Sequence, residues 1–203
     1  MTVPPLAPGD VRLVALLRGV NVGGRTIPMA ALRDAVAATG ARNVRTVLAS
    51  GNVLLDVCAD AALADVRGGL VSAISDAFGY DAHLALVPLD LASALAEAVP
   101  WPDDEATHGY VVVSTTPGLL EEAADAAAEA AARAAGTAVS DAQEVWQAPP
   151  SDLARALAEA GLDALLWRCP RGSSLSTPLA KTLARARFRA ATTRNVRTLR
   201  RLG

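Results

Sequence analysis

The chain has 203 residues, a formal net charge of −2 and an apolar fraction of 52%, but aromatic residues make up only 3%. This length is sufficient for one large domain or two small ones with a core built mainly from Leu, Val and Ala. No run of about 18 apolar residues and no signal-peptide pattern is present, so we expect a cytoplasmic protein with no membrane partner.

In the first half, apolar periodicity predicts four strands and two helices in the order β-α-β-β-α-β. The strands are expected at residues 11–17, 44–49, 53–57 and 83–87, and the helices at 28–39 and 63–78. Ser50, Gly51 and Asn52 separate the second and third strands with residues typical of a hairpin turn. We therefore predict an α+β protein with a ferredoxin-like plait over residues 1–87.

The second half, residues 88–203, is predicted to form a plait-like α+β subdomain that ends in basic helices. Strands are expected at residues 110–114, 144–148 and 164–169, and helices at 91–99, 119–135, 153–162, 177–188 and 193–202. The two halves have no visible sequence repeat, so a duplication would be detectable only in structure.

Charge is unevenly distributed along the chain. Residues 88–163 carry 14 acidic and 2 basic side chains, whereas residues 164–203 carry 10 basic and no acidic ones. A basic stretch of this kind favours a phosphate-bearing partner such as nucleic acid. The same charge distribution is equally explained if the basic end neutralises the acidic middle of the same chain.

Metal and thiol chemistry is not indicated by the sequence. Cys58 and Cys169 lack CxxC spacing, so we predict two small, partly buried residues and neither a disulfide nor a thiolate metal site. No cluster of His, Asp and Glu has metal-ligand spacing either, and we predict no metal.

The loop after the first strand reads RGVNVGGRT, from Arg18 to Thr26. It is one substitution away from the nucleotide-binding pattern G-x-x-x-x-G-K-[ST]. Arg25 replaces the lysine, Pro28 starts the helix after the glycines, and parallel βα repeats are lacking, so we reject a nucleotide-hydrolysing loop.

A simpler anion site remains possible at this loop. Gly19, Gly23 and Gly24 let backbone N–H groups point into one concavity, and Arg18 and Arg25 add charge beside it. The alternative is a glycine-rich turn in which the Asn21 side chain bonds its own backbone.

Near the C-terminus, the segment TTRNVRT combines hydroxyl, amide and guanidinium groups. Thr192 or Thr193 is suited to cap a terminal helix. Arg194 and Asn195, at the start of that helix, could instead complete an anion site.

Three segments together resemble the bacterial domain-of-unknown-function family 1697: ALLRGVNVGGRTIPMAALRDAV, NVRTVLASGNVLLDV and ATTRNVRTLRRL. In that family RGxNVGG with a following Lys or Arg, an SGNV hairpin and a C-terminal TTRN recur. The resemblance implies an α+β fold related to the ferredoxin-like plait, in two subdomains, and implies no reaction, substrate or cofactor. The recurring residues that we take as candidate ligand-binding residues are Arg18, Gly19, Asn21, Gly23, Gly24, Arg25, Ser50, Asn52, Thr192, Thr193, Arg194 and Asn195.

The leading functional hypothesis is binding of a phosphate-bearing ligand, either nucleic acid or a nucleotide-like molecule, through the first loop and the TTRN segment. One alternative is an enzyme on a small anionic metabolite, with a titratable group such as Asp56 beside Arg18 and Arg194. A second is a structural or partner-binding module without a ligand. The sequence assigns neither a cofactor nor an oligomeric state.

Overall fold

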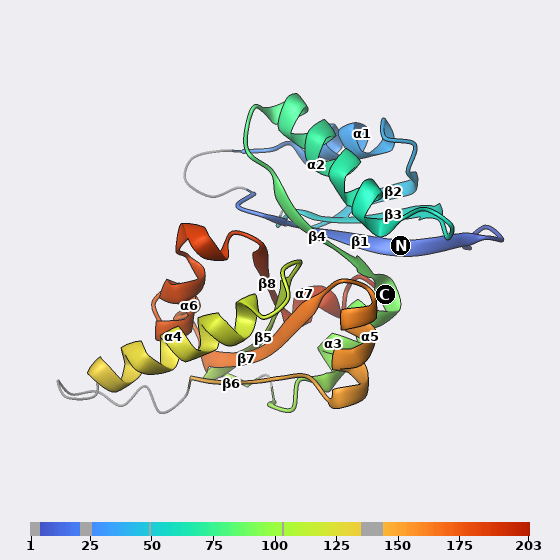
Figure 1. The fold of residues 1–203 in the computed structure, drawn as a ribbon. Coiled ribbons are helices and arrows are strands. Elements are labelled where there is room, and N and C mark those ends of the chain that lie inside the picture. Colours follow the sequence, from blue (N-terminus) through green and yellow to red (C-terminus); the bar gives the residue numbers. More distant parts are fainter. Residues whose placement is uncertain (1–4, 21–25, 49, 103, 135–143) are drawn as a thin grey trace. The chain divides into compact units, whose positions relative to one another are not determined.

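A computed structural model describes residues 5–20, 26–48, 50–102, 104–134 and 144–203 (Figure 1). It confirms the α+β class, with two antiparallel four-stranded sheets and helices. The chain divides into two compact units, one comprising Met1–Ala92 with Arg201–Gly203 and the other comprising Ser93–Arg200. The predicted division between residues 87 and 88 lies ahead of helix α3 (Leu89–Ala98), which carries the chain from one unit into the next.

The first unit follows the predicted order β-α-β-β-α-β. Its elements are β1 (Asp10–Arg18), α1 (Met29–Ala37), β2 (Arg42–Val47), β3 (Asn52–Cys58), α2 (Leu63–Phe78) and β4 (His83–Pro88). The strands lie in the order β2-β3-β1-β4 and all neighbours are antiparallel. Strand β3 therefore lies between β1 and β2, as in a split βαβ unit.

Both helices of this unit cover one face of its sheet (Figure 1). Alternate residues of β1, Leu13, Ala15 and Leu17, pack on that face with Leu32 of α1 and Leu70 of α2. Because side chains alternate across a strand, Arg12 and Arg18 lie on the opposite face.

Helix α2 ends where the sequence predicts, whereas α1 ends at Ala37, two residues before its predicted end. Gly79 caps the C-terminus of α2 in the left-handed conformation, with φ of 62°, a conformation that glycine adopts without steric cost. Pro28 precedes α1 as its N-cap residue, in an extended conformation.

The second unit contains four strands and four α-helices within its described part, besides the end of α3. They are β5 (Thr107–Ser114), α4 (Leu119–Ala134), β6 (Val145–Gln147), α5 (Ser151–Glu159), β7 (Asp163–Pro170), α6 (Pro178–Leu183), β8 (Ala191–Asn195) and α7 (Val196–Leu199), with a 3₁₀ helix, η2 (Ala186–Phe188), after α6. The sheet order is β6-β7-β5-β8, again antiparallel throughout.

The strand order of the second unit repeats that of the first. If β5, β6, β7 and β8 are matched with β1, β2, β3 and β4, the two sheets have the same order. The duplication that the sequence could not reveal is thus present in the topology. The added helix α5 lies in the connection between β6 and β7.

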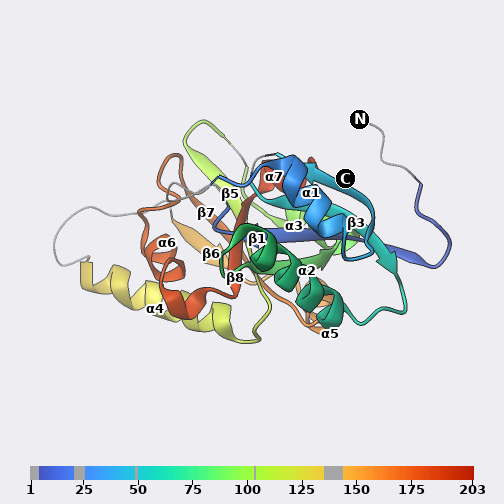
Figure 2. The same cartoon turned by 90° about the horizontal axis from the view of Figure 1, so that it is seen from above.

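The main core of the second unit lies between its sheet and helices α4 and α6, which are side by side in both views (Figures 1 and 2). Trp167 and Phe188 are its largest buried side chains. The Trp167 indole N–H donates to Glu144 Oε1 over 2.9 Å, and its ring centroid lies 4.8 Å from that of Tyr110.

The C-terminal helices differ from the prediction. The helix expected over residues 177–188 is divided: α6 begins after the Thr177 cap, ends at Leu183, and is followed by η2, which places Phe188 in the core. The prediction of a helix over residues 193–202 is wrong. Residues 191–195 form β8, because pairing along β5 satisfies their backbone groups, and only four residues of α7 follow.

Candidate functional site

Arg18 is the last residue of β1 and lies directly opposite His83 of β4. Both side chains are on the sheet face that turns away from α1 and α2. The Arg18 side chain is half-buried, and this desolvation lowers the pKa of its guanidinium. The group is still cationic at neutral pH, and partial burial strengthens its attraction to an anion.

The glycine-rich loop is anchored at both ends. Gly19 adopts a positive φ of 70°, and the next residue, Val20, is buried. At the far end Ile27 is buried in the same apolar core as Val20. The other predicted site residues of this loop, Asn21, Gly23, Gly24 and Arg25, lie outside the described residues.

The surroundings of the loop agree with the rejection of a nucleotide-hydrolysing loop. Thr26 precedes α1, which begins at Met29, so its hydroxyl is not in the first helical turn. The sheet is antiparallel, whereas a nucleotide-binding sheet of that kind is built from parallel βα units.

The structure brings the SGN hairpin against the start of this loop. The Leu17 amide donates to the Gly51 carbonyl over 2.8 Å. Gly51 has a positive φ of 72°, and a Cβ placed on it would lie 2.8 Å from Val20 Cγ2. Two of the three sequence motifs are therefore in contact within the first unit, and Gly51 is the residue that permits it.

Asn52 and Ser50 hold the hairpin together. The Asn52 side chain is fully buried, and its Nδ2 donates to the Val47 carbonyl over 3.0 Å and to Ser50 Oγ over 2.9 Å. These hydrogen bonds fix the hairpin, which contacts the start of the loop through Gly51.

The TTRN segment lies in the second unit, as strand β8. Thr192 and Arg194 are opposite Val113 and Val111 of β5 and share one face. Arg194 Nη1 donates to Thr192 Oγ1 over 2.9 Å and to the Thr193 carbonyl over 2.8 Å. The residue is 8% exposed, and this burial lowers the pKa of its guanidinium to about 10.

The predicted helix cap is displaced by two or three residues. Asn195, and neither Thr192 nor Thr193, caps α7, and its Oδ1 accepts from the Arg197 amide over 2.8 Å. The correction follows from β8: both threonines are strand residues, so the first residue free to cap is Asn195.

A buried ion pair that sequence reasoning missed lies at the other end of the first sheet. Asp56 is fully buried and accepts from Arg12 through both oxygens, at 2.6 and 2.7 Å, and from Asn43 Nδ2 at 2.8 Å. These bonds, above all those from Arg12, lower the pKa of the carboxyl group. Opposite charges on two neighbouring strands are the only signal that the sequence carried.

Asp56 is therefore unsuited to the role that the enzyme hypothesis gave it. It pairs with Arg12, whereas Arg18 is six residues further along β1, a separation of about 20 Å in an extended strand. Its oxygens are occupied, and its lowered pKa keeps it ionised.

The basic end of the chain is only partly neutralised by the acidic middle. Arg187 forms an ion pair with Glu122 of α4. Within the described part of the chain, no ion pair engages the three exposed cations around it, Lys181, Arg185 and Arg189. Both explanations of the charge asymmetry thus retain support.

The two cysteines differ in environment. Cys169 is buried, as predicted, and burial raises the pKa of its thiol to about 12. Cys58 is exposed, contrary to the prediction, at the C-terminal end of β3. Neither forms a disulfide.

Comparisons with known proteins agree with this fold. The family described as "Protein of unknown function (DUF1697)" matches residues 11–146. Among solved structures, the conserved bacterial protein SP0830 from Streptococcus pneumoniae is similar with a TM-score of 0.64 and 22% identity, covering 95% of this chain and 97% of that one. A search of curated proteins gave no match.

No helix in the described ranges is long and apolar enough to cross a membrane. The family match spans about two thirds of the chain and includes the Arg18 loop and the SGN hairpin. The chain therefore belongs to the DUF1697 family of proteins of unknown function.

Proposed function

We propose that this protein binds a phosphate-bearing ligand, either a nucleic acid or a nucleotide-like molecule, at the loop that follows β1. The observation that carries the proposal is the position of Arg18, a half-buried cation directly before a glycine at positive φ. A planar guanidinium matches the geometry of phosphate oxygens, and glycine-rich backbone supplies N–H donors beside it.

The residues on both sides of the loop are held by the fold. Val20 and Ile27 are buried in the core, and the Gly51 turn packs on Leu17 and Val20. We therefore propose that the SGN hairpin supports the Arg18 loop.

Arg194 is a second candidate cation, and its role is tested separately. Its hydrogen bonds to Thr192 and Thr193 hold the guanidinium within β8, and Asn195 is occupied in capping α7. We therefore assign Asn195 to the stability of the second unit, as the cap of α7. A contribution of Arg194 to ligand binding is tested by the amide shifts of Thr192–Asn195 on addition of ATP.

The second unit carries exposed cations of its own, Lys181, Arg185 and Arg189, which favour nucleic acid as a ligand of that unit. Phosphate contacts made by such side chains release counterions, so the affinity for nucleic acid should fall steeply with salt. A mononucleotide bound only at the Arg18 loop would show a much smaller salt dependence.

The test compares binding of a fluorescein-labelled 20-nucleotide single-stranded DNA and of ATP to the wild type, Arg18→Gln and Arg33→Gln. Arg33 is an exposed arginine of α1 in the same unit, so its replacement makes the same charge change away from the loop. We expect Arg18→Gln to weaken binding of at least one probe about tenfold and Arg33→Gln to change it less than twofold.

Two results would contradict the proposal. The first is that neither probe binds at low salt. The second is that Arg18→Gln lowers the melting temperature and leaves binding unchanged, which would make Arg18 a structural residue and favour the module without a ligand.

A further inference from the structure

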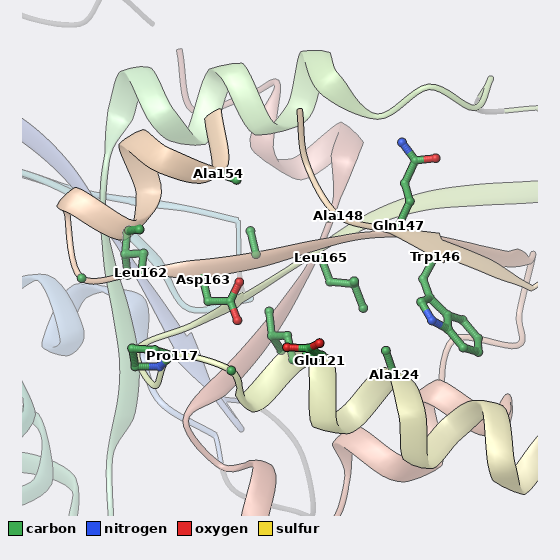
Figure 3. A pocket seen from close by; sticks show the side chains of 15 residues that line it. Pro117, Glu121, Ala124, Trp146, Gln147, Ala148, Ala154, Leu162, Asp163 and Leu165 are labelled. Atoms are coloured by element: carbon green, nitrogen blue, oxygen red, sulfur yellow. The ribbon is translucent and has the colours of Figure 1, made fainter. Parts of the chain in front are cut away.

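A cavity of about 580 Å³ lies in the second unit, between helices α4 and α5 and over strands β6 and β7 (Figure 3). This volume is within the range of small-molecule sites. Alanines of the facing helices, including Ala124 of α4 and Ala154 of α5, leave this space open. Leu165 of β7 forms part of its apolar lining.

The acidic side chains of the cavity lie on one side of it. Figure 3 shows the carboxylates of Asp163 and Glu121 close to each other on one side, with the indole of Trp146 on the other. None of the described residues that line the cavity is basic. The segment that contains most of them, residues 88–163, also carries 14 acidic and 2 basic side chains.

Asp163 is held in place by the fold. Its carboxylate accepts from the backbone amides of Ala164, Leu120 and Gly118, the last two at the start of α4. Burial nevertheless raises its pKa, and the charge of Glu121 adds to that increase. Asp163 is partly desolvated and the exposed carboxylate of Glu121 lies beside it, so a cation that enters between them is stabilised.

Glu121 is available for such a cation. No ion pair or hydrogen bond engages its side chain within the described residues, whereas its neighbour Glu122 is paired with Arg187.

We propose that this cavity binds a small organic ammonium ion with an apolar body. The ammonium group lies between Glu121 and Asp163, and the hydrocarbon part extends over the alanine walls toward Trp146. The argument for this occupant is charge complementarity, because an anion would meet two carboxylates and a purely apolar compound would leave both without a counter-charge. The site is independent of the phosphate site proposed for the first unit.

The test is an NMR titration of the full chain with phenethylamine, 2-phenylethanol and 3-phenylpropionate, which share a phenyl ring and differ in charge. We expect phenethylamine to shift the Trp146 indole N–H and the Gly118 and Gly161 amides saturably. The neutral alcohol should bind about fivefold more weakly, and the carboxylate more weakly still.

Three variants locate the effect. Glu121→Gln should weaken phenethylamine binding about threefold, whereas Asp125→Asn, the same charge change on the same helix but outside the lining, should leave it unchanged. Ala154→Leu should abolish binding by filling the space. Three results would each overturn the proposal. The probes could bind with equal affinity, the shifts could fall on residues outside the lining, or the chain could associate with increasing concentration and close the cavity.

Discussion

In the first unit β2 and β3 are joined by a short connection between Val47 and Asn52, whereas in the second unit α5 stands between β6 and β7. The strand order is nevertheless the same, and every neighbouring pair in both sheets is antiparallel. The connection can therefore change without altering the sheet. The common feature is a central strand, β1 or β5, with apolar residues on the face that packs on helices.

The two units differ more in how they bury charge. In the first, Asp56 is held by Arg12 and Asn43, and its lowered pKa means that the fold favours the charged form. In the second, burial lowers the pKa of Arg194 to about 10, so the fold disfavours the charged form. A charge that the fold stabilises is explained by folding, whereas one that it destabilises calls for another reason, such as function.

The largest effect on stability is expected from Asp56→Asn. Removing one partner of a buried ion pair leaves the other uncompensated, which should lower the free energy of unfolding by about 3–5 kcal/mol. Tryptophan fluorescence cannot follow the first unit, because all three tryptophans are in residues 101–167. Urea unfolding should therefore be followed by circular dichroism as well.

The same residue predicts a pH dependence. Because the pKa of Asp56 is lower in the folded protein, its stabilisation is complete above the unfolded-state pKa of about 4 and is lost as the pH falls through the folded-state value. The wild type should thus lose stability on acidification more steeply than Asp56→Asn. Two results would show that the Arg12–Asp56 pair does not stabilise this sheet. One is an equal loss of stability on acidification in the wild type and Asp56→Asn. The other is a decrease in the free energy of unfolding of Asp56→Asn below about 1 kcal/mol at neutral pH.

The next largest effect concerns the contact between the hairpin and the loop. Gly51→Ala adds a methyl group 2.8 Å from Val20 Cγ2 at a positive φ, and should cost about 3 kcal/mol. Gly79→Ala also has a positive φ but no atom within 4 Å of the new methyl group, so it should cost only about 1 kcal/mol. If the two variants are equally stable by urea unfolding, the hairpin does not support the loop closely.

The smallest effect is predicted for Arg194→Met. Removal of a disfavoured buried charge offsets the loss of the bonds to Thr192 and Thr193, so the free energy of unfolding should change by less than about 1.5 kcal/mol. Tryptophan fluorescence reports on this unit directly. A loss above about 3 kcal/mol would show that Arg194 is kept for folding.

Most of the fold was predictable because its signals are local. The apolar run at residues 11–17 predicted β1, and Gly79 marked the end of α2. The exception was β8, whose five residues include two threonines and an arginine and carry no apolar alternation. Only pairing with β5, more than 75 residues earlier in the chain, defines it as a strand.

The site was less predictable for the same reason. The glycines of the first loop and the SGN turn were visible as motifs, but no pattern placed Gly51 against Val20. Likewise the partner of Asp56 is 44 residues away in sequence, and the cavity beside Trp146 exists because small residues of two helices face each other. Packing between residues far apart in the chain determines these features, and no local pattern in a single sequence predicts that packing.

The most direct test of the proposed function is a ¹H–¹⁵N NMR titration of the full chain with ATP at low salt. We expect saturable shifts at the amides of Gly19, Val20 and Thr26, with an affinity about tenfold lower in Arg18→Gln and unchanged in Arg33→Gln. Shifts at Thr192–Asn195 would show that the TTRN segment also responds to ATP. Saturable shifts that avoid residues 18–26 altogether, or no shifts with either ATP or the single-stranded DNA, would contradict the proposed function.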